Sequence, residues 1–117
     1  MTTGSLGQGF STACGVALGC RIKGLKNYTY TVIGDGESNE GQIWEAALFA
    51  AHRKLSNLIA FADYNHQCID GRTEEICDLG DLDRKFREFN WYAQVIDGND
   101  VGQIYTAICN AKAQTER

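Results

Sequence analysis

Oxygen-bearing side chains follow two apolar runs of this 117-residue sequence. Asp35 stands in a Gly-Asp-Gly tripeptide directly after the run at 27–34, and Asn65 closes the run at 57–63. One carboxylate, one amide oxygen and a nearby backbone carbonyl form a set of hard oxygen ligands, which suits Mg²⁺ or Ca²⁺. Because a single carboxylate holds such an ion weakly, an anionic ligand such as a diphosphate would have to complete the coordination.

Gly36 and the helix that follows it favour such an anion. Glycine lets a ligand approach the backbone closely, and a helix N-terminus attracts negative charge. A purely structural interpretation stays open, with Gly-Asp-Gly as a tight turn and Asn65 as a turn former. Glu40, at the start of the helix, is either a solvated acid or a carboxylate that hydrogen-bonds a group from another subunit.

Other candidate residues indicate less chemistry. The glycine-rich segment at 4–9 lacks the preceding strand of a dinucleotide-binding fingerprint, so it predicts a helix start that admits a flat ligand or a neighbouring backbone. His52 is expected on a helix as a partly exposed or satisfied side chain, and His66 lies beside Asn65. No nucleophile arrangement follows from these spacings. Five cysteines without C-x-x-C spacing indicate small buried or half-buried thiols in a reducing cytoplasm.

A helix–strand alternation would position these residues. Helices are predicted over 7–22, 40–54, 82–89 and 99–114, and strands over 27–34, 57–63 and 91–98. The second strand is expected to be buried on both faces. The alternation implies an α/β fold of three layers, α/β/α, with a mostly parallel sheet whose ligands bind beyond the carboxyl ends of the strands. The expected buried side chains are Phe10, Cys14, Ala17, Leu18, Ile43, Ala47, Ala50, Ala51, Leu82, Phe86, Phe89, Val101, Ile104, Tyr105 and Ile108.

Composition limits the classes of partner. The net charge is −4 and basic residues form no cluster, which argues against nucleic acid and against an anionic membrane surface. No apolar run is long enough to span a membrane, and the first residues lack the pattern of a signal peptide. We therefore expect a soluble cytoplasmic protein in which residues 1–117 form a single domain.

Three segments together resemble the pyrophosphate-binding half of a transketolase, and most closely the N-terminal subunits of split bacterial transketolases. They are residues 3–19, 32–71 and 81–100, and the Gly-Asp-Gly…Asn pair within them is similar to the thiamin diphosphate signature of that superfamily. The resemblance implies a thiamin diphosphate-binding fold in partial form. Compared with that family, we expect the chain to be incomplete, because the region before residue 4, the strand after residue 117 and the pyrimidine-binding domain are not part of this sequence.

The resemblance also implies roles for individual residues. Asp35 and Asn65 would bind Mg²⁺ through side-chain oxygens and Gln67 through its backbone carbonyl, while Gly36 and Asn65 would contact the diphosphate. Gly4, Ser5 and Leu6 would lie against the thiazolium and aminopyrimidine end of the cofactor, although many relatives have proline in place of Ser5. As the implied catalytic residue, Glu40 would couple to a carboxylate of a partner across a dimer interface. Asp70 and Gly71 match a turn with a structural role.

The function implied is transfer of a two-carbon ketol unit between sugar phosphates, as in the pentose phosphate pathway. A C-terminal, pyrimidine-binding subunit would supply the activating glutamate in a homo- or hetero-oligomer, so the isolated chain is expected to be inactive. One alternative is the α subunit of a thiamin diphosphate-dependent 2-oxo acid dehydrogenase, which residues 39–46 would also suit. Others are a non-catalytic remnant that serves as an interaction module and a flavodoxin-like nucleotide-binding domain.

Overall fold

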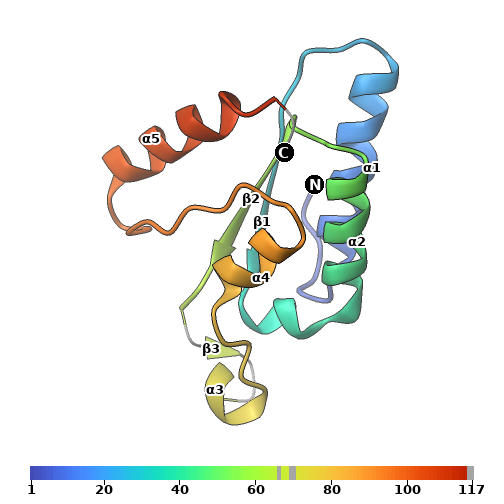
Figure 1. Ribbon diagram of the computed structural model, residues 1–117. Coiled ribbons are helices and arrows are strands. Elements are labelled where there is room, and N and C mark those ends of the chain that lie inside the picture. Colours follow the sequence, from blue (N-terminus) through green and yellow to red (C-terminus); the bar gives the residue numbers. More distant parts are fainter. Residues whose placement is uncertain (66, 69–70, 116–117) are drawn as a thin grey trace.

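The computed structural model describes residues 1–65, 67–68 and 71–115 and has α/β architecture (Figure 1). The predicted first four elements are confirmed within two residues at each end, and a short 3-10 helix, η1, links β1 to α2. In chain order the elements are α1 (Gln8–Ile22), β1 (Thr29–Gly34), η1 (Gly36–Asn39), α2 (Gly41–His52), β2 (Leu58–Asp63), β3 (Gln67–Cys68), β4 (Gly71–Arg72), α3 (Thr73–Ile76), α4 (Leu82–Glu88) and α5 (Val101–Lys112).

The two longer strands form a parallel pair, as the βαβ pattern predicts. β1 and β2 run in register from Thr29 opposite Leu58 to Gly34 opposite Asp63. Both strands therefore end at the same edge, with η1 and the start of α2 beside it. The short strands β3 and β4 form a separate antiparallel ladder that pairs Gln67 with Arg72.

Small side chains let α1 and α2 pack closely on one face of the strand pair. Ala17 and Ala47 are completely buried together with the larger Phe10, Ile33 and Ile43. Ala13 and Cys14 are also buried on α1. The predicted inner faces of both helices are therefore confirmed, except that Leu18 and Ala51 are half-buried. Close approach without voids is the packing that stabilises a small core.

On the other side of the strands, α5 completes the α/β/α arrangement seen in Figure 1. The ammonium of Lys112 lies 5.2 Å from the ring centre of Tyr28 and 5.8 Å from that of Tyr30. The side chains of Tyr30 and the buried Ile33 point to opposite faces of β1, because successive side chains of a strand alternate. α5 therefore approaches the face opposite α1 and α2.

An aromatic cluster attaches α4 to the core. The ring centres of Trp44 and Phe86 are 5.3 Å apart, and those of Phe86 and Trp91 are 5.6 Å apart. Trp91 also contacts Phe10, and its indole N–H donates to the carbonyl of Ala47. Leu82 and Phe86 are buried and Phe89 packs on the core, as predicted.

Three predictions of the sequence analysis are wrong. Residues 91–98 form no strand, because no strand of the described structure pairs with them; side chains bind two of their backbone groups, as Arg87 donates to Ala93 O and Asp97 N–H donates to Gln103 Oε1. On α5, Val101 and Tyr105 are 79% and 70% exposed, and Ala107 is the buried residue. The end of β2 is exposed rather than buried on both faces.

Sequence pattern, periodic in α5 and a continuous apolar run in β2, explains the second and third of these errors. It identifies which apolar residues share a face but not whether another element covers that face.

Within the part of the chain that the structure describes, no helix is both long and apolar enough to cross a membrane.

Candidate functional site

Asp35 lies at the carboxyl end of β1, where the sequence predicts it. Only 1% of its surface is exposed. Its N–H donates to the carbonyl of Asp63 at 3.1 Å, which continues the β1–β2 pairing by one residue. Its Oδ1 accepts the N–H of Gly36 at 2.8 Å and so caps η1. The carboxylate is therefore buried and oriented at the edge where both strands end.

Asn65 lies at the same edge, two residues beyond β2. Its side chain is exposed, and its Nδ2 donates to Oδ2 of Asp63 at 3.3 Å. The parallel register thus brings Asp35 and Asn65 to one edge, as predicted. It also adds the exposed carboxylate of Asp63, for which the sequence analysis assigned no role.

The backbone of Gln67 belongs to β3, and β3 lies against η1. Asp35, Asn65 and the backbone of this strand carry carboxylate, amide and carbonyl oxygens, the oxygen types that hard divalent cations prefer. Among the described residues, no three His, Cys, Asp or Glu side chains form a metal-binding group. A cation at this edge would therefore depend on amide and carbonyl oxygens as well as on Asp35.

The turn at residues 4–7 lies close to this edge because two distant side chains bind it. The N–H of Gly7 donates to Oε1 of Glu37 at 2.8 Å, and Gln42 Nε2 donates to the carbonyl of Leu6. Gly4, Ser5 and Leu6 are exposed, Leu6 by 57%. A Cβ added to Gly4 would have no neighbour within 4 Å, so this segment has open space beside it.

The glycine-rich start of α1 makes room for side chains. Gly7 has φ +85°, and an added Cβ would lie 2.5 Å from Gln42 Cγ. A Cβ on Gly9 would lie 2.5 Å from Thr3 Oγ1. The predicted close approach of a neighbouring backbone is therefore replaced by the side chains of Gln42 and Thr3.

Glu40 immediately precedes α2, which confirms its predicted place. It is half-buried, its backbone is extended, and its side chain makes no capping hydrogen bond to the helix. The neighbouring turn is held from inside: the buried Ser38 hydroxyl donates to Gly34 O at 2.9 Å, and Trp44 Nε1 donates to Ser38 O at 2.9 Å. Glu40 thus stands on a well-anchored turn.

Of the two predicted histidine positions, the structure describes only that of His52. His52 is the last residue of α2 and is exposed, at the end of the helix remote from Asp35. His66 and Asp70 lie outside the described residues. Gly71 begins β4 with φ +143°, a conformation that favours glycine at this turn.

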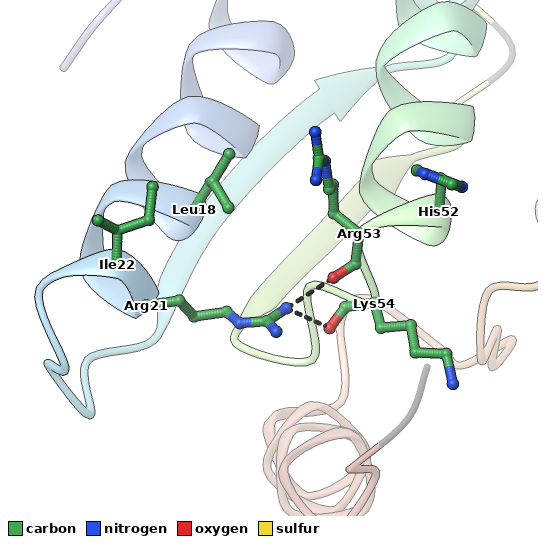
Figure 2. Close-up of a pocket in the computed structure, with 6 residues that line it drawn as sticks. All are labelled: Leu18, Arg21, Ile22, His52, Arg53 and Lys54. Carbon is green, nitrogen blue, oxygen red and sulfur yellow. Dashed lines mark hydrogen bonds between the residues drawn. The ribbon is translucent and has the colours of Figure 1, made fainter.

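A pocket of about 430 Å³ lies at the C-terminal ends of α1 and α2 (Figure 2). His52 lines it, together with Leu18, Arg21, Ile22, Arg53 and Lys54. Arg21 Nη1 donates to the carbonyls of Arg53 and Lys54, both at 2.7 Å. The guanidinium thus caps the C-terminal end of α2, so Arg21 has a structural role in the wall of this pocket.

The cysteine prediction is confirmed in part. Cys14 is buried, and this burial raises the pKa of its thiol to about 11. Cys20 is half-buried, but Cys77 and Cys109 are exposed. The four are free thiols, so the described structure gives none of them a disulfide.

Sequence reasoning missed the roles of Glu37 and Gln42. The sequence places Glu37 only as an acid near a helix start, whereas its carboxylate binds the N–H groups of both Gly7 and Gly34. Gly7 lies 30 positions from Glu37, and Leu6 lies 36 positions from Gln42. No local spacing could have identified these contacts.

The whole chain, residues 1–117, matches the family described as transketolase, thiamine diphosphate binding domain. It is 57% identical over 112 residues to the 6-deoxy-6-sulfo-D-fructose transketolase subunit SqwG of Clostridium sp. (strain MSTE9), covering 96% of this chain and 41% of that protein. It is 39% identical over 104 residues to an apulose-4-phosphate transketolase subunit of Actinobacillus succinogenes, covering 89% of this chain and 38% of that protein.

Solved structures give the same likeness. Transketolase from Campylobacter jejuni superposes with a TM-score of 0.90 at 29% identity, covering 97% of this chain and 19% of that one. A transketolase from Pichia stipitis superposes with a TM-score of 0.88 at 36% identity, covering 100% and 19%. The chain thus spans less than half the length of these relatives and has the fold of their thiamin diphosphate-binding part.

Proposed function

Since this chain belongs to the transketolase family, as its thiamine diphosphate-binding domain, we propose that it binds the diphosphate group of thiamin diphosphate together with Mg²⁺, in an enzyme that transfers two-carbon ketol units. The proposed substrates are sugar phosphates, as in pentose phosphate metabolism, and the proposed compartment is the cytoplasm. Residues 1–117 would form one thiamin diphosphate-binding domain that works with further parts of the enzyme.

The buried carboxylate of Asp35 is the observation that carries this proposal. Asp35 is 1% exposed, and the N–H of Gly36 orients its carboxylate at the edge where β1 and β2 end, a position from which it could bind a hard divalent cation. Asp35 and Asn65 would bind Mg²⁺ through side-chain oxygens and Gln67 through its carbonyl, a donor set suited to that ion. Gly36 and Asn65 would contact the diphosphate, whose oxygens would supply the remaining negative charge.

The turn at 4–7 would orient the other end of the cofactor. Gly4, Ser5 and Leu6 are exposed beside open space, and we propose that they contact the thiazolium and aminopyrimidine rings. When bound, thiamin diphosphate supplies the chemistry that breaks and forms the carbon–carbon bond. The residues of this chain bind and orient that group.

Catalysis is proposed to require a pyrimidine-binding partner subunit. Both named bacterial relatives are called subunits, which supports a division of the enzyme between chains. Glu40 is half-buried and makes no capping hydrogen bond to α2, so it could meet a carboxylate of the partner. A carboxylate pair of this kind would share a proton at the interface.

Calorimetry with thiamin diphosphate and Mg²⁺ tests the cofactor site. We expect binding by the protein together with its partner subunit, and its loss in Asp35→Asn, which removes the proposed metal-binding charge. Asp81→Asn is the matched control, because Asp81 is exposed and forms only a surface ion pair with Arg84. Equal affinity of Asp35→Asn and the control would refute the metal site, and no binding by wild type would refute the proposed function.

Turnover assays with two donors test the substrate class. The relatives are named for 6-deoxy-6-sulfo-D-fructose and for apulose 4-phosphate. The assay therefore compares a ketose phosphate with the sulfonated ketose, using the protein with its partner and an aldose phosphate acceptor. Turnover of the ketose phosphate supports the proposal, whereas turnover of the sulfonated sugar alone would refute a ketose phosphate as the donor substrate.

A further inference from the structure

The peptide group that joins Leu6 to Gly7 is bound at both of its polar atoms. The N–H of Gly7 donates to Oε1 of Glu37 at 2.8 Å, and the carbonyl of Leu6 accepts from Nε2 of Gln42. A planar peptide group that is bound at both ends cannot rotate without breaking one of these bonds. The orientation of the turn at this peptide is therefore set by η1 and α2 rather than by the turn itself.

The carboxylate of Glu37 also binds the end of β1. Its Oε2 accepts the N–H of Gly34 at 3.3 Å, while Ser38 Oγ donates to the carbonyl of the same glycine at 2.9 Å. Gly34 directly precedes Asp35, the proposed metal ligand. A single half-buried side chain thus links the turn before α1 to the residue before the metal site.

The charge of Glu37 alone does not explain its presence beside a diphosphate site. A negative side chain close to an anionic ligand weakens the binding of that ligand by repulsion. Two backbone N–H groups explain the acid better, because a carboxylate offers an acceptor oxygen to each of them. A glutamine offers one acceptor oxygen and would turn its NH₂ group, a donor, toward the second N–H.

We propose that Glu37 is a positioning residue, which holds the 4–7 turn in place relative to the end of β1 so that both can contact one cofactor. This inference rests on the proposed function. Glu37 acts through Gly7 and Gly34, and it is not proposed to touch the cofactor or the reacting atoms. Its effect should therefore appear in the affinity for the cofactor rather than in the chemical step.

Glu37→Gln tests this role, because it keeps the shape of the side chain and removes one acceptor. Three quantities are compared in the protein with its partner subunit: hydrogen exchange of the Gly7 amide without cofactor, the Kd of thiamin diphosphate in Mg²⁺, and the cofactor KM and kcat. Glu88→Gln makes the same charge change at an exposed position of α4 and serves as the control. Glu37→Asp keeps both acceptor oxygens on a shorter side chain.

We expect the Gly7 amide to exchange faster in Glu37→Gln and the Kd and KM of thiamin diphosphate to rise about tenfold. The kcat at saturating cofactor should stay within about twofold of wild type. The loss in Glu37→Asp should be smaller, because the two acceptors are retained, and Glu88→Gln should match wild type.

Unchanged or tighter cofactor binding in Glu37→Gln would overturn the inference, and tighter binding would show that charge is the main effect. A lower kcat with unchanged KM would also overturn it, because that pattern places the effect of Glu37 in the chemical step rather than in cofactor binding. Where the glutamine variant does not fold, Glu37→Asp decides: wild-type affinity for the cofactor in that variant, while its Gly7 amide exchanges faster than in wild type, refutes the role. Failure of wild type to bind the cofactor refutes the proposed function instead, while Gly7 exchange still reports on the hydrogen bond.

Discussion

Gly7→Ala should destabilise the protein through two separate effects. Gly7 has φ +85°, a left-handed conformation that costs an L-residue about 1–2 kcal/mol. The new Cβ would also lie 2.5 Å from Gln42 Cγ, so the Gln42 side chain must move and give up its hydrogen bond to Leu6 O, worth about 1 kcal/mol. The expected loss of unfolding free energy is about 2–3 kcal/mol.

Urea unfolding of the purified protein, followed by tryptophan fluorescence, measures this loss. Gly15→Ala is the matched control, because Gly15 lies inside α1 and a Cβ there meets nothing within 4 Å. Alanine is a better helix former than glycine, so this control should gain about 0.5–1 kcal/mol. The same substitution is thus expected to change stability in opposite directions at the two positions.

A double-mutant cycle with Gln42→Ala separates the two effects. The three atoms nearest to the added Cβ all belong to the Gln42 side chain beyond its own Cβ. In the Gln42→Ala background, Gly7→Ala should therefore cost only the conformational part, about 1–2 kcal/mol. The cycle should give a coupling of about 1 kcal/mol. A neutral Gly7→Ala, or costs that add fully in the double variant, would refute the steric argument.

Three further predictions follow from the packing and the pKa shifts. Phe86→Ala should lower the unfolding free energy by about 3–5 kcal/mol, since Phe86 is 8% exposed within the aromatic cluster, and urea unfolding measures this. At pH 8, iodoacetamide should label Cys77 well before Cys14, because burial raises the pKa of the Cys14 thiol to about 11. The same pKa shift favours the folded state below pH 9.0, and this stabilisation is lost as the pH rises toward 11, which unfolding curves at alkaline pH measure. Hydrogen bonds from Gln103, chiefly from its side chain, lower the pKa of Asp100. The Asp100 cap therefore stabilises α5 above pH 3.8, and this stabilisation is lost as the pH falls through the lowered pKa. Asp100→Ala should increase amide exchange in the first turn of α5 even at neutral pH.

The β1–α2–β2 unit could be predicted from the sequence because its signals are local. β-branched and aromatic residues at 29–33 and an apolar run at 58–62 specify strands, and the alanine-rich segment between them specifies a helix. The rule that such units are parallel then brings the carboxyl ends of both strands to one edge. The location of Asp35 and Asn65 at that edge follows from these local signals alone.

Contacts between distant segments decided what the sequence could not indicate. Residues 91–98 have the composition of a strand, but a strand needs a hydrogen-bonded neighbour, and no strand of the described structure pairs with this segment. The apolar pattern of α5 includes Val101 and Tyr105, yet the described structure leaves both largely exposed. Pattern alone cannot say which faces are covered.

The sequence by itself determined the order of α1, β1, α2 and β2, the strand ends that carry Asp35 and Asn65, and the oxygen chemistry expected there, because each depends on neighbouring residues. Only the tertiary structure decided how the 4–7 turn is held, since Glu37 and Gln42 reach it across 30 and 36 positions of chain. Glu37, an acid near a helix start in the sequence, is in three dimensions the acceptor for two backbone amides, because folding brings Gly7 to a side chain that also binds Gly34, three positions before it.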